Sequence, residues 1–154
     1  MSDPLDASES LLRLAMDQAQ LSLPQDVPIG AIIFNKVTGK VVGRGHNERE
    51  LDKDPTCHAE IVALRDAAKN QGDWRMNDCV IYITLEPCIM CAGALSQARI
   101  GGVVFGAYDK QCGAAGSIYN FFSDPRLPHN PPVIGGILAE ENQQILSSFF
   151  ASQR

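Results

Sequence analysis

The sequence predicts an α/β protein in which helices pack on a central sheet. Three short runs predict strands: 29–34 is apolar, 79–84 is rich in β-branched and aromatic residues, and 101–106 encloses two valines and a phenylalanine. Segments with apolar residues at helical spacing lie before, between and after these runs. Because strands that alternate with helices form layered domains, and because 154 residues suit one ordinary domain but not two, we expect a single domain over residues 1–154.

In the first half of the chain the pattern is helix, strand, strand, helix. Apolar residues between 11 and 19 recur with helical spacing, and two prolines separate this helix from the first strand. Residues 37–40 predict a short hairpin connection to an antiparallel second strand that begins at residue 41. A charged loop, 46–55, leads to an amphipathic helix that has apolar residues at 61–68 and ends near residues 70–72.

In the second half a buried strand at 79–84 precedes Pro87, a residue favoured at the start of a helix. The helix that follows extends past residue 95, and a short strand covers 101–106. A closing helix is expected at 139–150. The segment between, 108–132, is long and irregular, and such loops in compact domains are often functional.

The charge distribution argues against a general nucleic-acid binder. The formal net charge is −5, but three acidic residues and no basic ones lie in residues 1–10, which we expect to form a flexible acidic N-terminus. The remaining 13 basic and 15 acidic residues give a nearly neutral body with a net charge of −2. No apolar stretch approaches the roughly 18 residues of a membrane span and no signal peptide is evident, which favours a cytoplasmic protein without a membrane partner.

The cysteines favour metal binding over disulfides, because they are five in number and no secretory signal precedes them. The strongest local signal is Pro87-Cys88-Ile89-Met90-Cys91. Cysteines three residues apart on a helix lie on adjacent rows, so Cys88 and Cys91 can converge on one ion. By itself this spacing leaves open a redox dithiol or two small buried side chains.

The segment His58-Ala59-Glu60 favours metal binding over these alternatives. With Pro-Cys-x-x-Cys it forms the signature of zinc deaminases. His58, Cys88 and Cys91 are three ligands, and a structural zinc site normally has four, so a fourth position is left for a water whose pKa zinc lowers to about 7. On an ideal helix, however, Glu60 lies about 200° around the axis from His58, so helical periodicity does not place both in one site.

The sequence resembles the bacterial tRNA-specific adenosine deaminases of the cytidine deaminase-like superfamily over nearly its whole length. The segments that carry the resemblance are 27–31 (VPIGA), 45–47 (GHN), 54–60 (DPTCHAE), 84–94 (TLEPCIMCAGA), 113–117 (GAAGS) and the Phe149-Phe150 ending. The resemblance implies a three-layer α/β/α fold with a central mixed sheet, a homodimer, and one zinc per subunit bound by His58, Cys88 and Cys91.

The resemblance also implies the reaction and the roles of three further residues. Glu60 would move protons while water replaces the amino group at carbon 6 of the wobble adenosine in a tRNA anticodon loop, giving inosine and ammonia. Asn47 would hydrogen-bond the target nucleotide, and Ile29 would pack against the base. Tyr108 or Phe149 are candidates for stacking on anticodon bases.

Two departures from the family pattern weaken the RNA assignment. The long loop has Pro128-His129-Asn130 where the family usually has Asn-His-Arg, and the chain ends at Arg154 without a basic tail. Two alternatives therefore stand beside the tRNA hypothesis. One is deamination of a free base or nucleoside, such as guanine or cytosine, and the other is a zinc-stabilised, noncatalytic binding module. The proton-shuttling Glu60 argues against the second, because a structural site does not need it.

Overall fold

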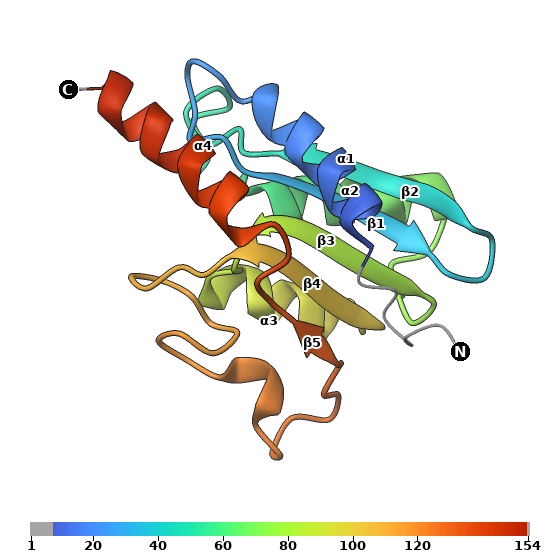
Figure 1. Cartoon of the computed structure of the whole chain (residues 1–154). Coiled ribbons are helices and arrows are strands. Elements are labelled where there is room, and N and C mark those ends of the chain that lie inside the picture. The colour runs from blue at the N-terminus through green and yellow to red at the C-terminus, as the bar shows by residue number, and fades with distance from the viewer. Residues whose placement is uncertain (1–7, 154) are drawn as a thin grey trace.

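A computed structural model describes residues 8–153 of the chain (Figure 1). Most of the predicted acidic N-terminus, residues 1–7, lies outside the described residues, as does residue 154, whereas Glu9 and Ser10 belong to the first helix. In order, the elements are α1 (Glu9–Gln20), β1 (Gly30–Asn35), β2 (Lys40–His46), α2 (Ala59–Gln71), β3 (Cys79–Leu85), α3 (Ile89–Gln97), β4 (Gly102–Ala107), η1 (Phe121–Ser123), β5 (Val133–Ile134) and α4 (Ala139–Ser152).

The five strands form one mixed sheet in the order β2-β1-β3-β4-β5. β1 is antiparallel to both of its neighbours, β2 and β3. β4 is parallel to both of its neighbours, β3 and β5. The hairpin predicted at residues 37–40 connects β1 and β2, and each of the other predicted strands and helices forms within a few residues of its expected bounds. The mixed sheet that the family resemblance implied is therefore confirmed.

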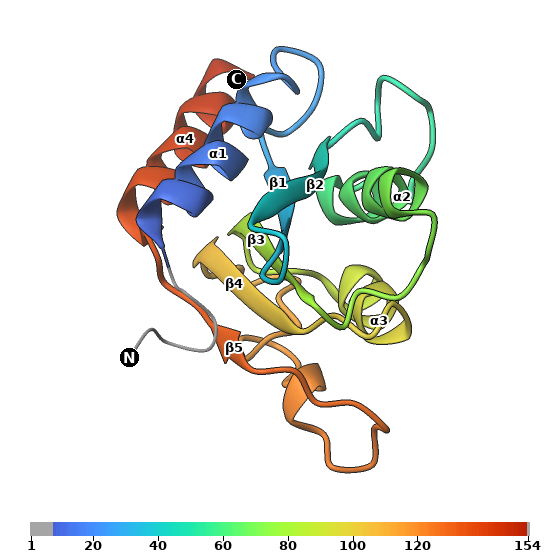
Figure 2. The same cartoon turned by 90° about the vertical axis from the view of Figure 1, so that its right-hand side faces the viewer.

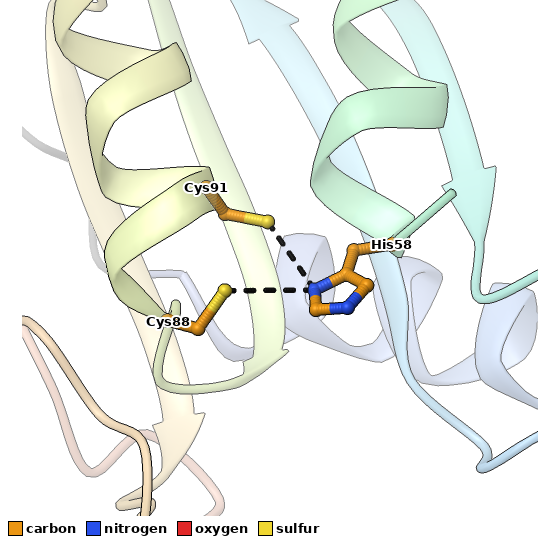
Figure 3. Close-up of side chains that lie close together, drawn as sticks. All are labelled: His58, Cys88 and Cys91. Carbon is orange, nitrogen blue, oxygen red and sulfur yellow. Dashed lines mark hydrogen bonds between the residues drawn. The ribbon is translucent and has the colours of Figure 1, made fainter. Parts of the chain in front are cut away.

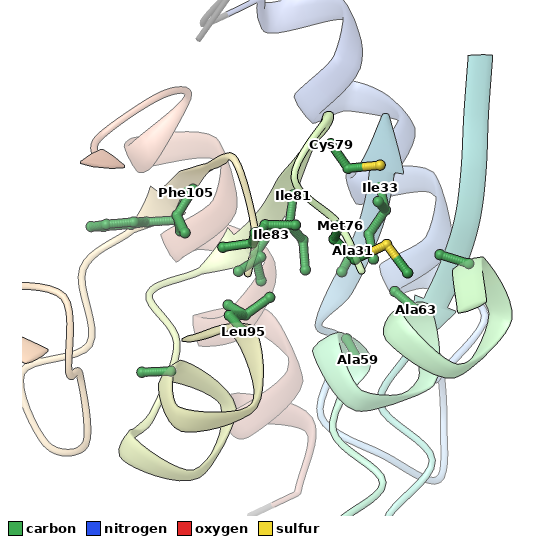
Figure 4. Packing of buried hydrophobic residues seen from close by; sticks show 14 of the residues in the cluster. Ala31, Ile33, Ala59, Ala63, Met76, Cys79, Ile81, Ile83, Leu95 and Phe105 are labelled. Carbon is green, nitrogen blue, oxygen red and sulfur yellow. The ribbon is translucent and has the colours of Figure 1, made fainter. Parts of the chain in front are cut away.

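Helices cover both faces of the sheet, which gives three layers (Figure 2). α1 and α4 lie side by side on one face, and α2 and α3 lie on the other. The strands alternate accordingly, because successive side chains of a strand point to opposite faces. Ile33, Ile81 and Ile83 belong to the larger cluster beneath α2 and α3 (Figure 4), whereas Ile32 and Tyr82 pack with Leu12 of α1.

The segment 108–132, which was expected to be irregular, contains one short element, and a second short element follows it directly. η1 is a single turn of 3-10 helix, and β5 adds two residues to the edge of the sheet beside β4. β5 was not predicted, because two residues between Pro132 and Gly135 are too few to show a periodic pattern. They form a strand only by pairing with β4, which is distant in the sequence. Within the described residues, no helix has both the length and the apolar character that crossing a membrane requires.

α2 lies directly on β2 because two glycines leave room for it. A Cβ atom at Gly45 would come within 2.4 Å of the Ala59 carbonyl oxygen and 2.5 Å of the Ala63 nitrogen. Gly43 faces the same helix one turn later, at 2.5 Å from the Ala63 carbonyl oxygen. Since all three atoms belong to the helix backbone, they cannot yield as a flexible side chain does. The position of the first turn of α2 therefore depends on Gly45.

We expect Gly45→Ala to lower the free energy of unfolding by about 1–3 kcal/mol, the usual cost of overpacking a well-packed contact. For a chain of this size that corresponds to a fall in Tm of about 2–4 °C per kcal/mol, measurable by circular dichroism. Gly93→Ala is the matched control, because a Cβ there meets nothing within 4 Å and alanine favours the helix. An unchanged Tm for Gly45→Ala would contradict the close packing of α2 on β2.

Candidate active site

The sheet topology brings four strand ends to one edge. Because β1 is antiparallel to its neighbours, its first residue, Gly30, pairs with His46 at the end of β2, and Ala31 pairs with Ile83 near the end of β3. β4 is parallel to β3 and ends beside it, with Leu85 opposite Ala107. The segments that precede β1 and follow β2, β3 and β4 therefore lie close together, although they are far apart in the sequence.

His58 reaches this edge from the N-terminal end of α2. It is the residue before the first helical turn and has an extended backbone, with φ −73° and ψ 157°. The expected 200° separation from Glu60 assumed that both residues were helical, and that assumption is wrong for His58. Because only Glu60 follows the helical path, the two side chains reach the same pocket.

Cys88 and Cys91 reach the edge from the start of α3. Cys88 likewise precedes its helix in an extended conformation, with φ −75° and ψ 174°, and Cys91 lies in the first turn. The Nδ1 atom of His58 lies 3.6 Å from the Cys88 Sγ and 3.5 Å from the Cys91 Sγ (Figure 3). The three ligand atoms all lie within 4.8 Å of one another, and they form the group suited to a metal ion among the described residues.

These distances fit a zinc ion. With Zn–S bonds of about 2.3 Å, Zn–N bonds of about 2.0–2.1 Å and tetrahedral angles, nitrogen and sulfur ligands of one zinc lie about 3.5 Å apart. Both observed nitrogen–sulfur distances match this edge length. Imidazole and thiolate are also the ligands that zinc favours, whereas calcium and magnesium take oxygen. Three protein ligands would leave one corner of the tetrahedron open.

The two thiols differ in their readiness to lose a proton. A hydrogen bond with the Cys91 thiol lowers the pKa of Cys88 to about 4, and His58 adds to this effect. The same hydrogen bond, together with burial, raises the pKa of Cys91. The hydrogen bond to Cys88 is also the main reason why the pKa of His58 is raised. Cys88 is therefore ready to bind a cation, and a metal must displace the proton shared with Cys91.

Glu60 lies beside this trio and is almost completely buried, with 4% of its surface exposed. Burial raises the pKa of its carboxyl group, and the nearby positive His58 only partly offsets that effect. A raised pKa is a common property of carboxyl groups that act as general acid and base in catalysis.

Glu60 and His58 line a pocket of about 230 Å³ that also contains the other two predicted site residues. Asn47 is buried, and its side chain donates to the Val27 carbonyl at 3.3 Å and accepts from the Arg49 nitrogen at 3.3 Å. Its backbone nitrogen donates to the carbonyl of Ile29, which lines the same wall. These bonds leave the Asn47 amide a second N–H and further lone pairs. The role of either residue in substrate binding stays a prediction.

One further histidine, two further cysteines and the two candidates for base stacking are not among the residues that line this pocket. His129 contacts the Ile100 carbonyl oxygen with its Nε2 and lines a separate pocket. Cys57, at the entry to α2, contacts Asp54, and Cys79 is buried in the core. Of the candidates for base stacking, Tyr108 packs edge-on against Phe105 and lines a second pocket that adjoins the first, whereas Phe149 faces a groove along α1.

Several pocket residues had no assigned role at the sequence level. Phe150, and not its neighbour Phe149, reaches the pocket from α4, and Cys112 reaches it from the long loop. Consecutive residues of a helix point about 100° apart, so only the packing of α4 decides which phenylalanine faces the site. Five more of the unassigned lining residues are Val27, Arg49, Leu85, Glu86 and Asp109. What these residues share is their position in the sequence, since each lies near one of the strand ends that meet at this edge. That position is the feature from which they could have been predicted.

Comparison with known proteins agrees with this geometry. The profile of the cytidine and deoxycytidylate deaminase zinc-binding region matches residues 5–107. A tRNA-specific adenosine deaminase of Haemophilus influenzae is 42% identical over 147 residues, which cover 95% of this chain and 84% of that protein.

Two solved structures are similar over most of the chain. One comes from a study of A-to-I editing by tRNA:A34 deaminases at the wobble position of transfer RNA, and it matches with a TM-score of 0.85 and 38% identity over 90% of this chain and all of that one. A guanine deaminase from Bacillus subtilis matches with a TM-score of 0.62 and 31% identity over 94% and 92% of the two chains. The chain therefore belongs to the zinc-binding cytidine and deoxycytidylate deaminase family, and within it to the tRNA-specific adenosine deaminases.

Proposed function

We propose that this protein is a zinc-dependent hydrolase that converts the wobble adenosine of a tRNA anticodon to inosine and releases ammonia. The observation that carries the proposal is the convergence of His58, Cys88 and Cys91 at a pocket that the buried carboxyl group of Glu60 lines together with His58 and Cys88. The 42% identity to a tRNA-specific adenosine deaminase supports the choice of substrate.

The chain's own residues account for metal binding and proton transfer. His58, Cys88 and Cys91 would hold one zinc ion per subunit, which when bound supplies Lewis-acid activation of water. Glu60 would accept a proton from the attacking water as the water oxygen adds to carbon 6 of adenine. Glu60 then returns a proton to the departing amino group, so that adenosine and water give inosine and ammonia. A buried carboxyl group with a raised pKa suits both transfers.

The pocket suits a single base that has left the stack. Its volume of about 230 Å³ is below the roughly 300–1,000 Å³ of pockets for drug-sized ligands, so it would accept one nucleobase and not a stretch of nucleic acid. Ile29 would pack on the base, and the free hydrogen-bonding capacity of Asn47 would meet the nucleotide. A base in a single-stranded anticodon loop costs less to extrude than one in a duplex.

A free-base deaminase is the second candidate, and a specific observation favours it. The guanine deaminase from Bacillus subtilis shares 31% identity with this chain. The nearly neutral body of the protein also offers little general attraction to RNA phosphates. The tRNA proposal is preferred because the identity to the tRNA-specific relative is higher over a similar share of the chain.

An ammonia-release assay on zinc-loaded protein decides between these candidates. An anticodon stem-loop with adenosine at the wobble position is offered beside guanine, cytosine, adenosine and cytidine, and a stem-loop with guanosine at that position serves as the matched control. We expect release of ammonia only from the adenosine stem-loop, with inosine in the digested product. Turnover of free guanine or cytosine with an inert stem-loop would overturn the tRNA proposal.

The proposal includes a homodimer in the cytoplasm, where tRNA is found. The homodimer is implied by the family resemblance, whereas the cytoplasmic location is the expectation drawn from the sequence. The surface around α3 supports a subunit contact, because Ile89 and Trp74 are about half exposed there and interfaces are enriched in such side chains. The dimer stays a prediction.

A further inference from the structure

Glu86 is a buried carboxylate that the proposed chemistry does not use. It follows β3 and precedes Pro87 and the zinc-ligand candidate Cys88, and only 2% of its surface is exposed. Among the described residues no cationic side chain forms an ion pair with it. A buried carboxylate without a cation must be stabilised by hydrogen-bond donors, so the identity of those donors indicates its role.

Within residues 8–153, the donors to the Glu86 side chain all come from one loop. Its Oε1 accepts from the backbone nitrogen of Asp109 at 3.0 Å and from the hydroxyl of Ser117. Its Oε2 accepts from the backbone nitrogens of Ala115 and Ser117, each at 3.0 Å. The carboxylate thus bonds both ends of the segment 109–117 that leaves β4.

The middle of that segment packs against Glu86 as well. A Cβ atom at Gly113 would lie 2.3 Å from the Glu86 carboxyl carbon, so the loop passes the carboxylate at a distance that only glycine allows. Gly113 also forms a β-bridge with Cys88, and the Ala114 nitrogen donates to the Pro87 carbonyl at 2.8 Å. The loop is therefore attached both to the side chain of Glu86 and to the two residues that follow it.

The segment held in this way forms one wall of the active-site pocket. Asp109 and Cys112 line the pocket together with Glu86 itself, and His58 and Glu60 line the same pocket. We infer that Glu86 is a positioning residue that fixes the segment 109–117 as a pocket wall and thereby sets how tightly the nucleotide binds. Its effect on the reaction rests on the proposed deaminase function, whereas its effect on the loop does not.

Glu86→Gln tests this inference with little change in volume. Four donors face the two carboxylate oxygens, and glutamine has only one oxygen acceptor. Whichever way the amide is turned, its NH₂ group faces at least one backbone N–H that it cannot bond, because only the Ser117 hydroxyl among the four groups can also accept. We expect the amides of the segment 109–117 to exchange with deuterium about tenfold faster or more, since hydrogen bonds to charged groups are the stronger ones. Exchange in α1 should not change.

A comparison of KM, kcat and zinc content distinguishes a positioning role of Glu86 from a general structural role. KM for the anticodon stem-loop should rise about tenfold, with kcat within about threefold of wild type and the zinc content unchanged. Ser117→Ala removes only the hydroxyl donor and should give a smaller rise in KM in the same direction. Asp124→Asn is the control, because Asp124 also accepts from a backbone nitrogen, that of Arg126, but lies outside the pocket.

Unchanged exchange in the segment 109–117 of Glu86→Gln would overturn the inference, and so would a fall in kcat at unchanged KM. If Glu86→Gln folds poorly, Ser117→Ala decides by the same two measurements. Exchange and zinc content do not depend on the substrate. An inert stem-loop with the wild-type protein would therefore reject the proposed function, while the exchange experiment would still judge the role of Glu86 in the loop.

Discussion

Glu60→Ala is expected to keep its zinc and to lose deamination, with kcat lower by at least about 10²–10⁴-fold, the usual contribution of general acid–base catalysis. The zinc content should hold because the three candidate ligand atoms come from His58, Cys88 and Cys91, and none comes from Glu60. The loss of turnover should exceed that of an ordinary catalytic residue, because one carboxyl group serves two proton transfers.

The measurement compares kcat from ammonia release with zinc per chain from plasma mass spectrometry on the same preparation. Glu140→Ala, at the exposed start of α4, is the control for removing a glutamate outside the pocket. Glu60→Gln adds a second variant of nearly equal volume, since an alanine leaves a buried cavity. If either Glu60 variant kept activity within about tenfold of wild type, Glu60 would not be the proton carrier.

The main elements were predictable from the sequence because their signals are local. The strands 79–84 and 101–106 and the helices at 61–68 and 139–150 each carry their own periodicity, and each is found in the structure. β5 is the counterexample. Its two residues are a strand only because β4 lies beside them, and a contact between distant segments leaves no trace in so short a run.

The candidate site was predictable where it rests on a motif and not where it rests on three-dimensional packing. Cys88, Cys91 and His58 were identified from spacing and signature, and the structure brings them together. The helical-wheel argument that separated Glu60 from His58 failed because the residue before a helix does not follow the helical angle. Glu86 gave no signal, since its four donors lie more than 20 residues further along the chain.

Cys88→Ser is expected to lose bound zinc, because a serine hydroxyl is not deprotonated as the thiol is, and zinc favours thiolate. The hydrogen bond with Cys91 lowers the pKa of the Cys88 thiol to about 4, which favours the thiolate form that binds a cation. After dialysis against a weak chelator we expect wild-type protein to retain about one zinc per chain and Cys88→Ser to retain less than about a tenth of that, in line with the loss of a direct ligand.

Thermal denaturation gives an independent test of the same assignment. A ligand that binds only the folded state raises stability by RT ln(1 + [L]/Kd), so the Tm of wild-type protein should fall with a strong chelator and recover with zinc. The Tm of Cys88→Ser should respond to neither addition. Cys112→Ser is the matched control, because Cys112 lines the same pocket but is not among the three converging ligands. Full zinc content in Cys88→Ser would show that the cation is held by a different set of atoms. The same conclusion would follow if Cys112→Ser lost as much zinc as Cys88→Ser.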